Sequence, residues 1–345
     1  MKHKNGFPLL QVLLILLISG CSQQVHYPKK NIFALKHDSI SSELIVFTVP
    51  NYEMESVVLF GVTSYTLNPI EKMIIFSTLS YGNEQLAIIP KEGNARLLTD
   101  VNQYLRFPNI SPDGKMILFE MRDDITGDSK VMIMDKDKLI MEPLVNGDSS
   151  GIFPIWSRDG KLASFLTPSV TCTSEELVHC FDLSIVSIET KSIVAKINGP
   201  INYYFPVSWS SDSDEVVFSM WINGYYKLII YNISEEKETA FGDNNQNNTI
   251  GVWSDNGERI AYSRTSSDGQ DTSNICFLEN STPNCNTQHF QSITGILWID
   301  NQTLLFGTYN SENNSTTVKL MDAISERTID LGTYSGYLDS FQTLK

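Results

Sequence analysis

Histidine is scarce in this chain, and so are the motifs of common hydrolytic sites. The 345 residues include five histidines, and His37, His179 and His289 are those beyond the N-terminal segment described below. The sequence holds no H-E-x-x-H zinc motif and no phosphate-binding loop. Catalysis therefore receives little support, although carboxylates that folding brings together would escape this search.

Positive charge is also in short supply. Lys and Arg number 25 against 40 Asp and Glu, which gives a formal net charge of -15. This sign argues against nucleic acid or an anionic membrane surface as a partner. An acidic surface favours cationic partners or divalent ions, but it also keeps an exported domain soluble, and we prefer this second interpretation.

An apolar run near the N-terminus indicates export. It begins near Leu9, follows Lys2 and Lys4, and ends in small residues before Cys21. A positive head, a short apolar segment and small residues at the break are typical of a signal peptide, and the run is too short for a membrane-spanning helix.

The residues at 18–21, Ile-Ser-Gly-Cys, resemble the lipobox of bacterial lipoproteins. The resemblance implies that residues 1–20 are removed, that Cys21 is acylated, and that residues 21–31 form a tether. Ser22 stands where Asp would imply inner-membrane retention, so the resemblance implies the outer membrane. The alternative is an ordinary secretory signal with an incidental cysteine.

Cysteine is used sparingly in the exported part. Four cysteines follow Cys21, in two close pairs. An even number in an oxidising compartment predicts disulfides, so we expect two hairpin staples, Cys172 with Cys180 and Cys276 with Cys285. Zinc binding is the alternative, but neither pair has the C-x-x-C spacing.

One segment recurs along the exported part. Each copy has an apolar or aromatic residue, a small polar residue, an acidic turn and a short β-rich run. Clear copies include Pro108, Pro154, Trp209 and Trp253, and weaker ones Leu67 and Trp298. The closing aromatics recur every 43 to 53 residues, at Phe76, Phe119, Phe165, Phe218, Tyr262 and Phe306. That period, with Asp-Gly turns between alternating runs, predicts propeller blades of four short antiparallel strands.

These copies resemble the TolB-type WD-like β-propeller repeat, W-S-P-D-G-K-x-I-A-F, over most of residues 60–330. The resemblance implies an all-β propeller across residues 32–345. Six copies are visible, and the residues left over at both ends amount to about one more repeat. We therefore predict seven blades, with one blade assembled from both termini so that no sheet edge stays exposed, and keep six as the alternative.

Aromatic residues fall into two groups. Those in phase with the repeat predict packing between blades: Trp156, Trp209, Trp253 and Trp298. Those out of phase are the candidates for ligand binding: Tyr203, Tyr204, Trp221, Tyr225 and Tyr226.

Two oxygen-rich loops, at 123–128 and 242–248, offer the ligands that calcium prefers. Neither has the spacing of an EF-hand, so solvated hairpin tips are the preferred interpretation and calcium the weaker one. We expect no cofactor, and the sequence identifies no metal ligand.

Together these features predict a noncatalytic outer-membrane lipoprotein that serves as a binding scaffold in the bacterial envelope. Its expected partners are an envelope protein, a peptide or a glycan, with the membrane reached through the acyl anchor and no role for nucleic acid. Two alternatives stay open: an envelope polysaccharide hydrolase or lyase with a site at the propeller axis, and a periplasmic ligand sensor. Display toward the periplasm or the cell surface is left open too.

Overall fold

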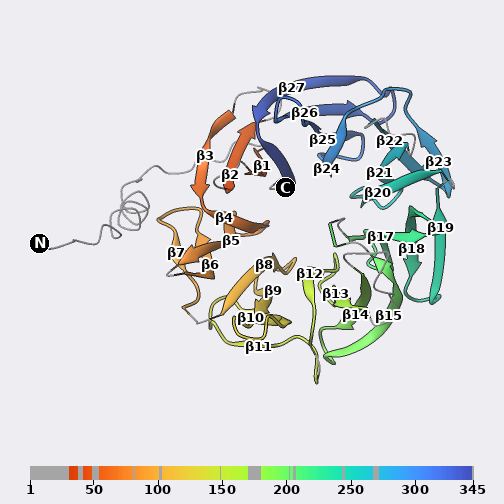
Figure 1. The fold of residues 1–345 in the computed structure, drawn as a ribbon. Helices are drawn as coiled ribbons and strands as arrows, with labels where there is room; N and C mark the ends of the chain where they lie inside the picture. Colours follow the sequence, from red (N-terminus) through yellow and green to blue (C-terminus); the bar gives the residue numbers. More distant parts are fainter. Residues whose placement is uncertain are drawn as a thin grey trace, which may run out of the picture.

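The computed structural model describes residues 31–37, 42–48, 54–80, 82–100, 103–147, 149–169, 180–201, 203–204, 207–242, 245–266 and 272–343. The predicted signal peptide, Cys21 and most of the tether lie outside these residues, as do Cys172 and His179. The described part is all β, without a helix. Figure 1 shows the strands arranged as sheets around a central axis, with the C-terminus near that axis.

Five sheets have four strands each, all antiparallel. Their orders are β28(Tyr337–Thr343)-β1(Asn31–His37)-β2(Ser42–Thr48)-β3(Met54–Phe60), β4(Val62–Asn68)-β5(Met73–Ser80)-β6(Asn83–Ile89)-β7(Arg96–Leu97), β8(Tyr104–Ile110)-β9(Met116–Arg122)-β10(Ser129–Asp135)-β11(Met141–Pro143), β20(Gln246–Trp253)-β21(Arg259–Ser266)-β22(Ser273–Glu279)-β23(Thr282–Cys285) and β24(Ser292–Trp298)-β25(Thr303–Asn310)-β26(Ser315–Asp322)-β27(Thr328–Ser335).

The remaining sheet has eight strands. Its members are β12(Ile152–Trp156), β13(Leu162–Pro168), β14(Phe181–Ser187), β15(Ser192–Ile201), β16(Ser208–Trp209), β17(Glu215–Ile222), β18(Tyr225–Asn232) and β19(Lys237–Phe241). One residue pair, Ile201 with Met220, joins β15 to β17. Divided there, the long sheet becomes two four-stranded runs. Seven blades stays a prediction, because the count depends on that division.

The two ends of the chain meet in one sheet, as predicted. β28 pairs with β1 from Ile32 opposite Thr343 to His37 opposite Tyr337. The Oγ1 of Thr343 also donates to the carbonyl of Asn31 at 3.1 Å. This pairing closes the ring, so that the C-terminal strand covers the edge that β1 would otherwise expose.

A hydrogen-bonded turn explains the recurring sequence. Each serine that opens a clear copy donates from its Oγ to the Asp or Asn two residues later, at 2.5 to 2.8 Å. The same oxygen accepts the backbone N–H five residues later, at 2.9 to 3.0 Å. These serines are Ser111, Ser157, Ser210 and Ser254. We call the end of the sheets that carries these turns the turn face.

Glycine usually occupies the fourth position of this turn because the backbone there is left-handed. Gly114, Gly160 and Gly257 have φ of 74 to 75°. In the copy without glycine, Ser213 adopts a φ of 66°. Its Oγ accepts the backbone N–H of Asp159 in the neighbouring turn at 3.0 Å, so this side chain links two copies.

The core lies between successive sheets. The closing aromatic of each copy stands on the second strand and is at most 3% exposed. The in-phase tryptophans are buried as well, between 3% and 9% exposed, which agrees with packing between sheets. Each hydrophobic cluster of described residues joins two neighbouring four-stranded runs. Inter-sheet burial therefore holds the ring together.

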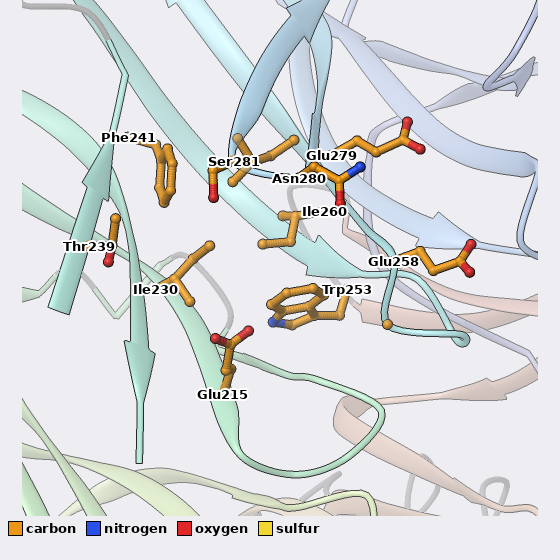
Figure 2. Close-up of a pocket in the computed structure, with 12 residues that line it drawn as sticks. Glu215, Ile230, Thr239, Phe241, Trp253, Glu258, Ile260, Glu279, Asn280 and Ser281 are labelled. Carbon is orange, nitrogen blue, oxygen red and sulfur yellow. The ribbon is translucent and has the colours of Figure 1, made fainter. Parts of the chain in front are cut away.

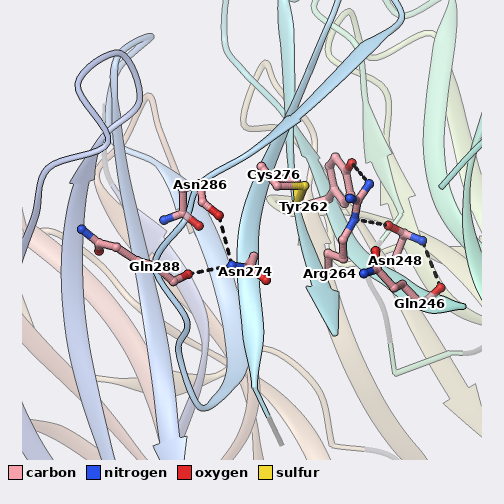
Figure 3. The surroundings of a disulfide bond; sticks show 9 residues. Gln246, Asn248, Tyr262, Arg264, Asn274, Cys276, Asn286 and Gln288 are labelled. Atoms are coloured by element: carbon pink, nitrogen blue, oxygen red, sulfur yellow. Dashed lines mark hydrogen bonds between the residues drawn. A yellow bond between two sulfur atoms is a disulfide. The ribbon is translucent and has the colours of Figure 1, made fainter. Parts of the chain in front are cut away.

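A disulfide joins β22 to β23. Cys276 and Cys285 stand directly opposite each other and are bonded as predicted. Figure 3 shows Asn274 beside them, whose side-chain N–H₂ donates to the carbonyls of Asn286 and Gln288 at 3.1 and 2.8 Å. Cys180 is also disulfide-bonded, but because Cys172 lies outside the described residues, their pairing stays a prediction.

Among the residues that the structure describes, no helix is long and apolar enough to span a bilayer.

Candidate functional site

Four aromatic rings form a continuous cluster at the end of the sheets opposite the turn face. The ring centroids of Phe107 and Phe153 are 4.1 Å apart. Phe153 stacks on Tyr203 at 5.6 Å and an interplanar angle of 12°, and Tyr203 lies 4.2 Å from Tyr204. We call these four residues the aromatic chain. Phe181 packs edge-on against Tyr203 at 5.7 Å and supports it from β14.

The aromatic chain becomes more exposed toward Tyr204. Phe107, Phe153 and Tyr203 are partly buried, whereas Tyr204 is 65% exposed. The hydrogen bond between the two tyrosines raises the pKa of Tyr203 to about 12, so its hydroxyl stays protonated at physiological pH. The cluster therefore presents an aromatic surface that carries tyrosine hydroxyl groups.

Backbone bulges position the two phenylalanines. Phe107 and Phe153 have φ of 50 and 52°, where β8 and β12 change register against their partners. Positive φ is unfavourable for a bulky residue and persists only where surrounding contacts hold it. Here the N–H of Phe107 donates to Ser64 Oγ at 2.9 Å. Bulges with positive φ recur in β20 and β28, so the bulge belongs to the repeat and the phenylalanine rings do not.

Two charged residues, Arg106 on β8 and Glu120 on β9, lie close to Phe107 in the sheet. Arg106 precedes Phe107, lies 5.5 Å from the centroid of the Tyr104 ring, and its Nε donates to Glu84 Oε2. Glu120 stands opposite Arg106 in the sheet and accepts from Ser129 Oγ at 2.6 Å. Burial raises the pKa of Glu120. The guanidinium of Arg106 is thus held in place by Glu84 and lies over the Tyr104 ring.

The other predicted aromatics form a second pair nearby. Trp221 faces Tyr226 across β17 and β18, with centroids 4.9 Å apart and an interplanar angle of 70°. Tyr225 is the next residue in the same hairpin, and it is only partly buried. The bridge between Ile201 and Met220 brings the end of β15, just before Tyr203, beside this hairpin. Four of the five predicted residues therefore form two contacting pairs, Tyr203 with Tyr204 and Trp221 with Tyr226. Tyr225 stands opposite Ile222 in the hairpin of the second pair.

Sequence reasoning missed Phe107 and Phe153. Both stand inside strands that follow the repeat, and the bulge that positions their rings leaves no distinct sequence pattern. The equivalent bulge positions are Ile250 in β20 and Ser340 in β28. Phe107 and Phe153 differ from these counterparts only in being aromatic.

The two described histidines, His37 and His289, do not share a site. His37 Nε2 lies 3.3 Å from Asp339 Oδ1, and this hydrogen bond raises the pKa of His37. His289 follows β23 in a different sheet, and His179 lies outside the described residues. Within the described part, no group of three or more His, Cys, Asp or Glu side chains could hold a metal ion.

A nucleophile-elbow pattern, G-x-S-x-G, occurs at residues 147–151, which read G-D-S-S-G. An elbow requires a turn from a strand into a helix that exposes the serine. Here the segment connects β11 to β12, and Ser149 is 2% exposed. The segment therefore matches the motif in sequence but not in structure.

The loop at 123–128 folds as a hairpin tip, the interpretation preferred over calcium binding. Asp123 Oδ1 accepts the backbone N–H groups of Ile125 and Thr126, both at 2.8 Å. These bonds lower the pKa of Asp123 and form a local turn. The loop at 242–248 is described only in part.

Comparison with known proteins supports the fold. No protein-family model and no curated protein matches the sequence. The structure is similar to TolB from Acinetobacter baumannii, with a TM-score of 0.52, 13% identity and coverage of 91% of this chain and 82% of TolB. It is also similar to an oligogalacturonate lyase in complex with manganese, with a TM-score of 0.61, 13% identity and coverage of 86% and 83%.

A third similar structure is the β-propeller domain of the Trilobed protease from Pyrococcus furiosus, with a TM-score of 0.53, 13% identity and coverage of 88% and 84%. At these identities the likeness shows the fold alone. The chain has a TolB-like β-propeller fold, a scaffold on which binding proteins and enzymes both occur.

Proposed function

We propose that this chain is a noncatalytic lipoprotein of the outer membrane, held by acylated Cys21, whose propeller binds an envelope protein or peptide through the aromatic chain. The observation that carries the proposal is the ring cluster that ends in Tyr204, which is 65% exposed. Tyrosine and arginine are enriched among the residues that dominate protein interfaces.

The geometry favours a protein or peptide as the occupant. The stacked rings of Phe153 and Tyr203 offer a flat apolar surface, and the hydroxyls of Tyr203 and Tyr204 border it. Arg106 precedes Phe107 in β8 and is already held by Glu84, so it loses little conformational freedom when a partner carboxylate or carbonyl approaches. A glycan would bind the same rings by stacking on them. The test below distinguishes a glycan from a protein partner.

The test is photocrosslinking in cells from a residue replaced at Tyr204. A matched control carries the crosslinker at Ile324, which is 62% exposed and lies on the turn face, where the N–H of the next-door Ala323 donates to Gln302 at 2.7 Å. We expect a discrete protein adduct from position 204 and none from position 324. Equal adducts from both positions, or a glycan adduct at 204, would contradict a protein-binding aromatic chain.

The anchor is tested separately with Cys21→Ser. This variant should lose acyl labelling and membrane attachment, and the adduct from position 204 should fall because the propeller is no longer held beside its partner. If the Cys21→Ser variant stays attached to the membrane, the proposed acyl anchor is refuted. The proposal that the aromatic chain binds a partner would be unaffected.

A further inference from the structure

A cavity opens on the turn face, between the strands β17–β19 and β20–β23. Its volume is about 600 Å³, within the range of small-molecule sites. Its lining mixes apolar and acidic side chains, chiefly Glu215, Ile230, Phe241, Trp253, Ile260 and Leu278. Figure 2 shows Ile230 and Phe241 from one sheet facing Trp253 and Ile260 from the other. The cavity lies at the opposite end of the strands from the aromatic chain and is independent of it.

Trp253 differs from the other in-phase tryptophans. Its indole N–H has no hydrogen-bond partner among the described residues, although the side chain is only 9% exposed. The other three donate to the preceding four-stranded run: Trp156 to the Asn109 carbonyl at 3.0 Å, Trp209 to Ser164 Oγ at 3.2 Å and Trp298 to the Val252 carbonyl at 3.1 Å. A buried donor without an acceptor is unfavourable.

The preceding run bonds the backbone of Trp253 and not its indole. Asn109 and Val252 each stand two residues before the serine that opens a turn, and Ser208 is their counterpart. β16 contains only Ser208 and Trp209. Ser208 Oγ accepts the backbone N–H of Trp253 at 3.1 Å, but the Trp253 indole receives no partner and borders the cavity instead.

Glu215 supplies charge beside that donor. Figure 2 shows its carboxylate on the same side of the cavity as the Trp253 nitrogen. Glu215 accepts from the neutral Asn232 amide at 3.3 Å, and no Lys or Arg of the described part pairs with it. Of the two other acidic residues of the lining, Glu279 pairs with Arg259 at 3.2 Å, and Figure 2 shows the Glu258 carboxylate pointing away from the Trp253 nitrogen. Glu215 is therefore the carboxylate available to a ligand.

We propose that this cavity binds a flexible amphipathic organic cation, in which an aliphatic chain links an ammonium to a hydrogen-bond acceptor oxygen. The ammonium pairs with Glu215, the oxygen accepts the nearby Trp253 N–H, and the chain between them folds against Ile230, Phe241 and Ile260. A lysine residue within a peptide has this chemistry, and so does a free amino alcohol.

The test uses the full chain in detergent, labelled with 5-fluorotryptophan, and follows the ¹⁹F resonance that disappears in Trp253→Phe. The probes are Nα-acetyl-lysine N-methylamide, its uncharged analogue Nα-acetyl-norleucine N-methylamide, and 6-aminohexan-1-ol. We expect a saturable shift with the lysine probe at a dissociation constant about tenfold lower than with the norleucine probe, the difference made by one charge-assisted contact.

Glu215→Gln should remove that tenfold preference. The matched control is Glu238→Gln, which changes an exposed carboxylate on β19 next to Thr239 but outside the lining, and it should bind like the unmodified chain. Comparing the two probes on the unmodified chain keeps the test valid if Glu215→Gln folds poorly.

The outcomes are distinct. Binding of the lysine probe alone assigns the site to a peptide, and binding of the amino alcohol as well assigns it to small amines. Equal binding of lysine and norleucine probes, or no shift of the Trp253 resonance with any probe, would overturn the proposal.

Discussion

The two ends of the sheets follow the repeat to different degrees. On the turn face, Ser111, Ser157, Ser210 and Ser254 make the same pair of hydrogen bonds in every clear copy. At the opposite end, the aromatic chain occurs once, across β8, β12 and the residues after β15. Repeated contacts build the ring, whereas a contact made once is free to serve recognition. This contrast predicts large stability effects in the repeat and small ones in the aromatic chain.

The largest effect is expected from emptying a repeated core position. Phe119 is fully buried on β9, in the cluster between β5 and β10. Phe119→Ala should lower the free energy of unfolding by about 3–5 kcal/mol, measured by denaturant titration. Tyr204→Ala, the comparison, should change it by less than about 0.5 kcal/mol. Similar losses in both variants would break the contrast between the two ends.

The disulfide should come next. Cys276→Ala combined with Cys285→Ala removes the staple across the β22–β23 hairpin. The chain-entropy model predicts a loss of about 2–3 kcal/mol for so short a loop. Urea unfolding of the double variant against the oxidised chain measures it, and an unchanged midpoint would show that the hairpin needs no staple.

Loss of a turn serine should have a smaller effect. Ser157 is fully buried, donates to Asp159 at 2.7 Å and accepts from Leu162 N–H at 3.0 Å. Ser157→Ala leaves both groups without their partner and should cost about 1–3 kcal/mol of unfolding free energy. Ser325→Ala, at an exposed turn, should cost less than about 0.5 kcal/mol. Equal effects of the two would mean that the repeated turn adds no stability.

The smallest effect is expected from His37, at the closure of the ring. Its hydrogen bond with Asp339 raises its pKa above 6.5, so the folded state binds the proton more tightly. This contribution is fully present below pH 6.5 and is lost as the pH rises through the folded-state pKa. Melting temperatures of the unmodified chain should therefore fall slightly over that rise.

His37→Gln should flatten this pH dependence, while the other titrating groups stay as they are. A pH dependence identical in the two proteins would show that the contact between β1 and β28 is insensitive to the charge of His37.

The architecture could be predicted because its signal is repeated. The weaker copies keep the turn by another route. Asn68 Oδ1 accepts the N–H groups of Ile70 and Glu71 at 2.9 and 3.0 Å, and Asp300 Oδ1 accepts those of Gln302 and Thr303 at 2.8 and 2.7 Å. A side-chain oxygen at the start of the turn replaces the Asp-Gly pair. The spacing of the repeat is therefore kept in the two copies that lack the Asp-Gly motif.

The sites could be predicted only in part, because they depend on contacts between distant residues. Tyr203 and Tyr204 stood out by being out of phase, but their neighbours Phe107 and Phe153 did not. Trp253 looks identical to its counterparts in sequence, and it differs in that its indole N–H has no acceptor among the described residues. The absence of a hydrogen-bond acceptor on another strand cannot be read from the sequence around the donor residue.

The most direct test of the account measures recognition and stability in the same variants. Tyr204→Ala and Ile324→Ala, both in the lipidated chain, are compared for partner recovery after crosslinking in cells and for melting temperature. We predict that Tyr204→Ala loses most of the recovered partner while its melting temperature stays within about 2 °C, and that Ile324→Ala changes neither. Full recovery with Tyr204→Ala, or an equal loss with Ile324→Ala, would contradict recognition through the aromatic chain.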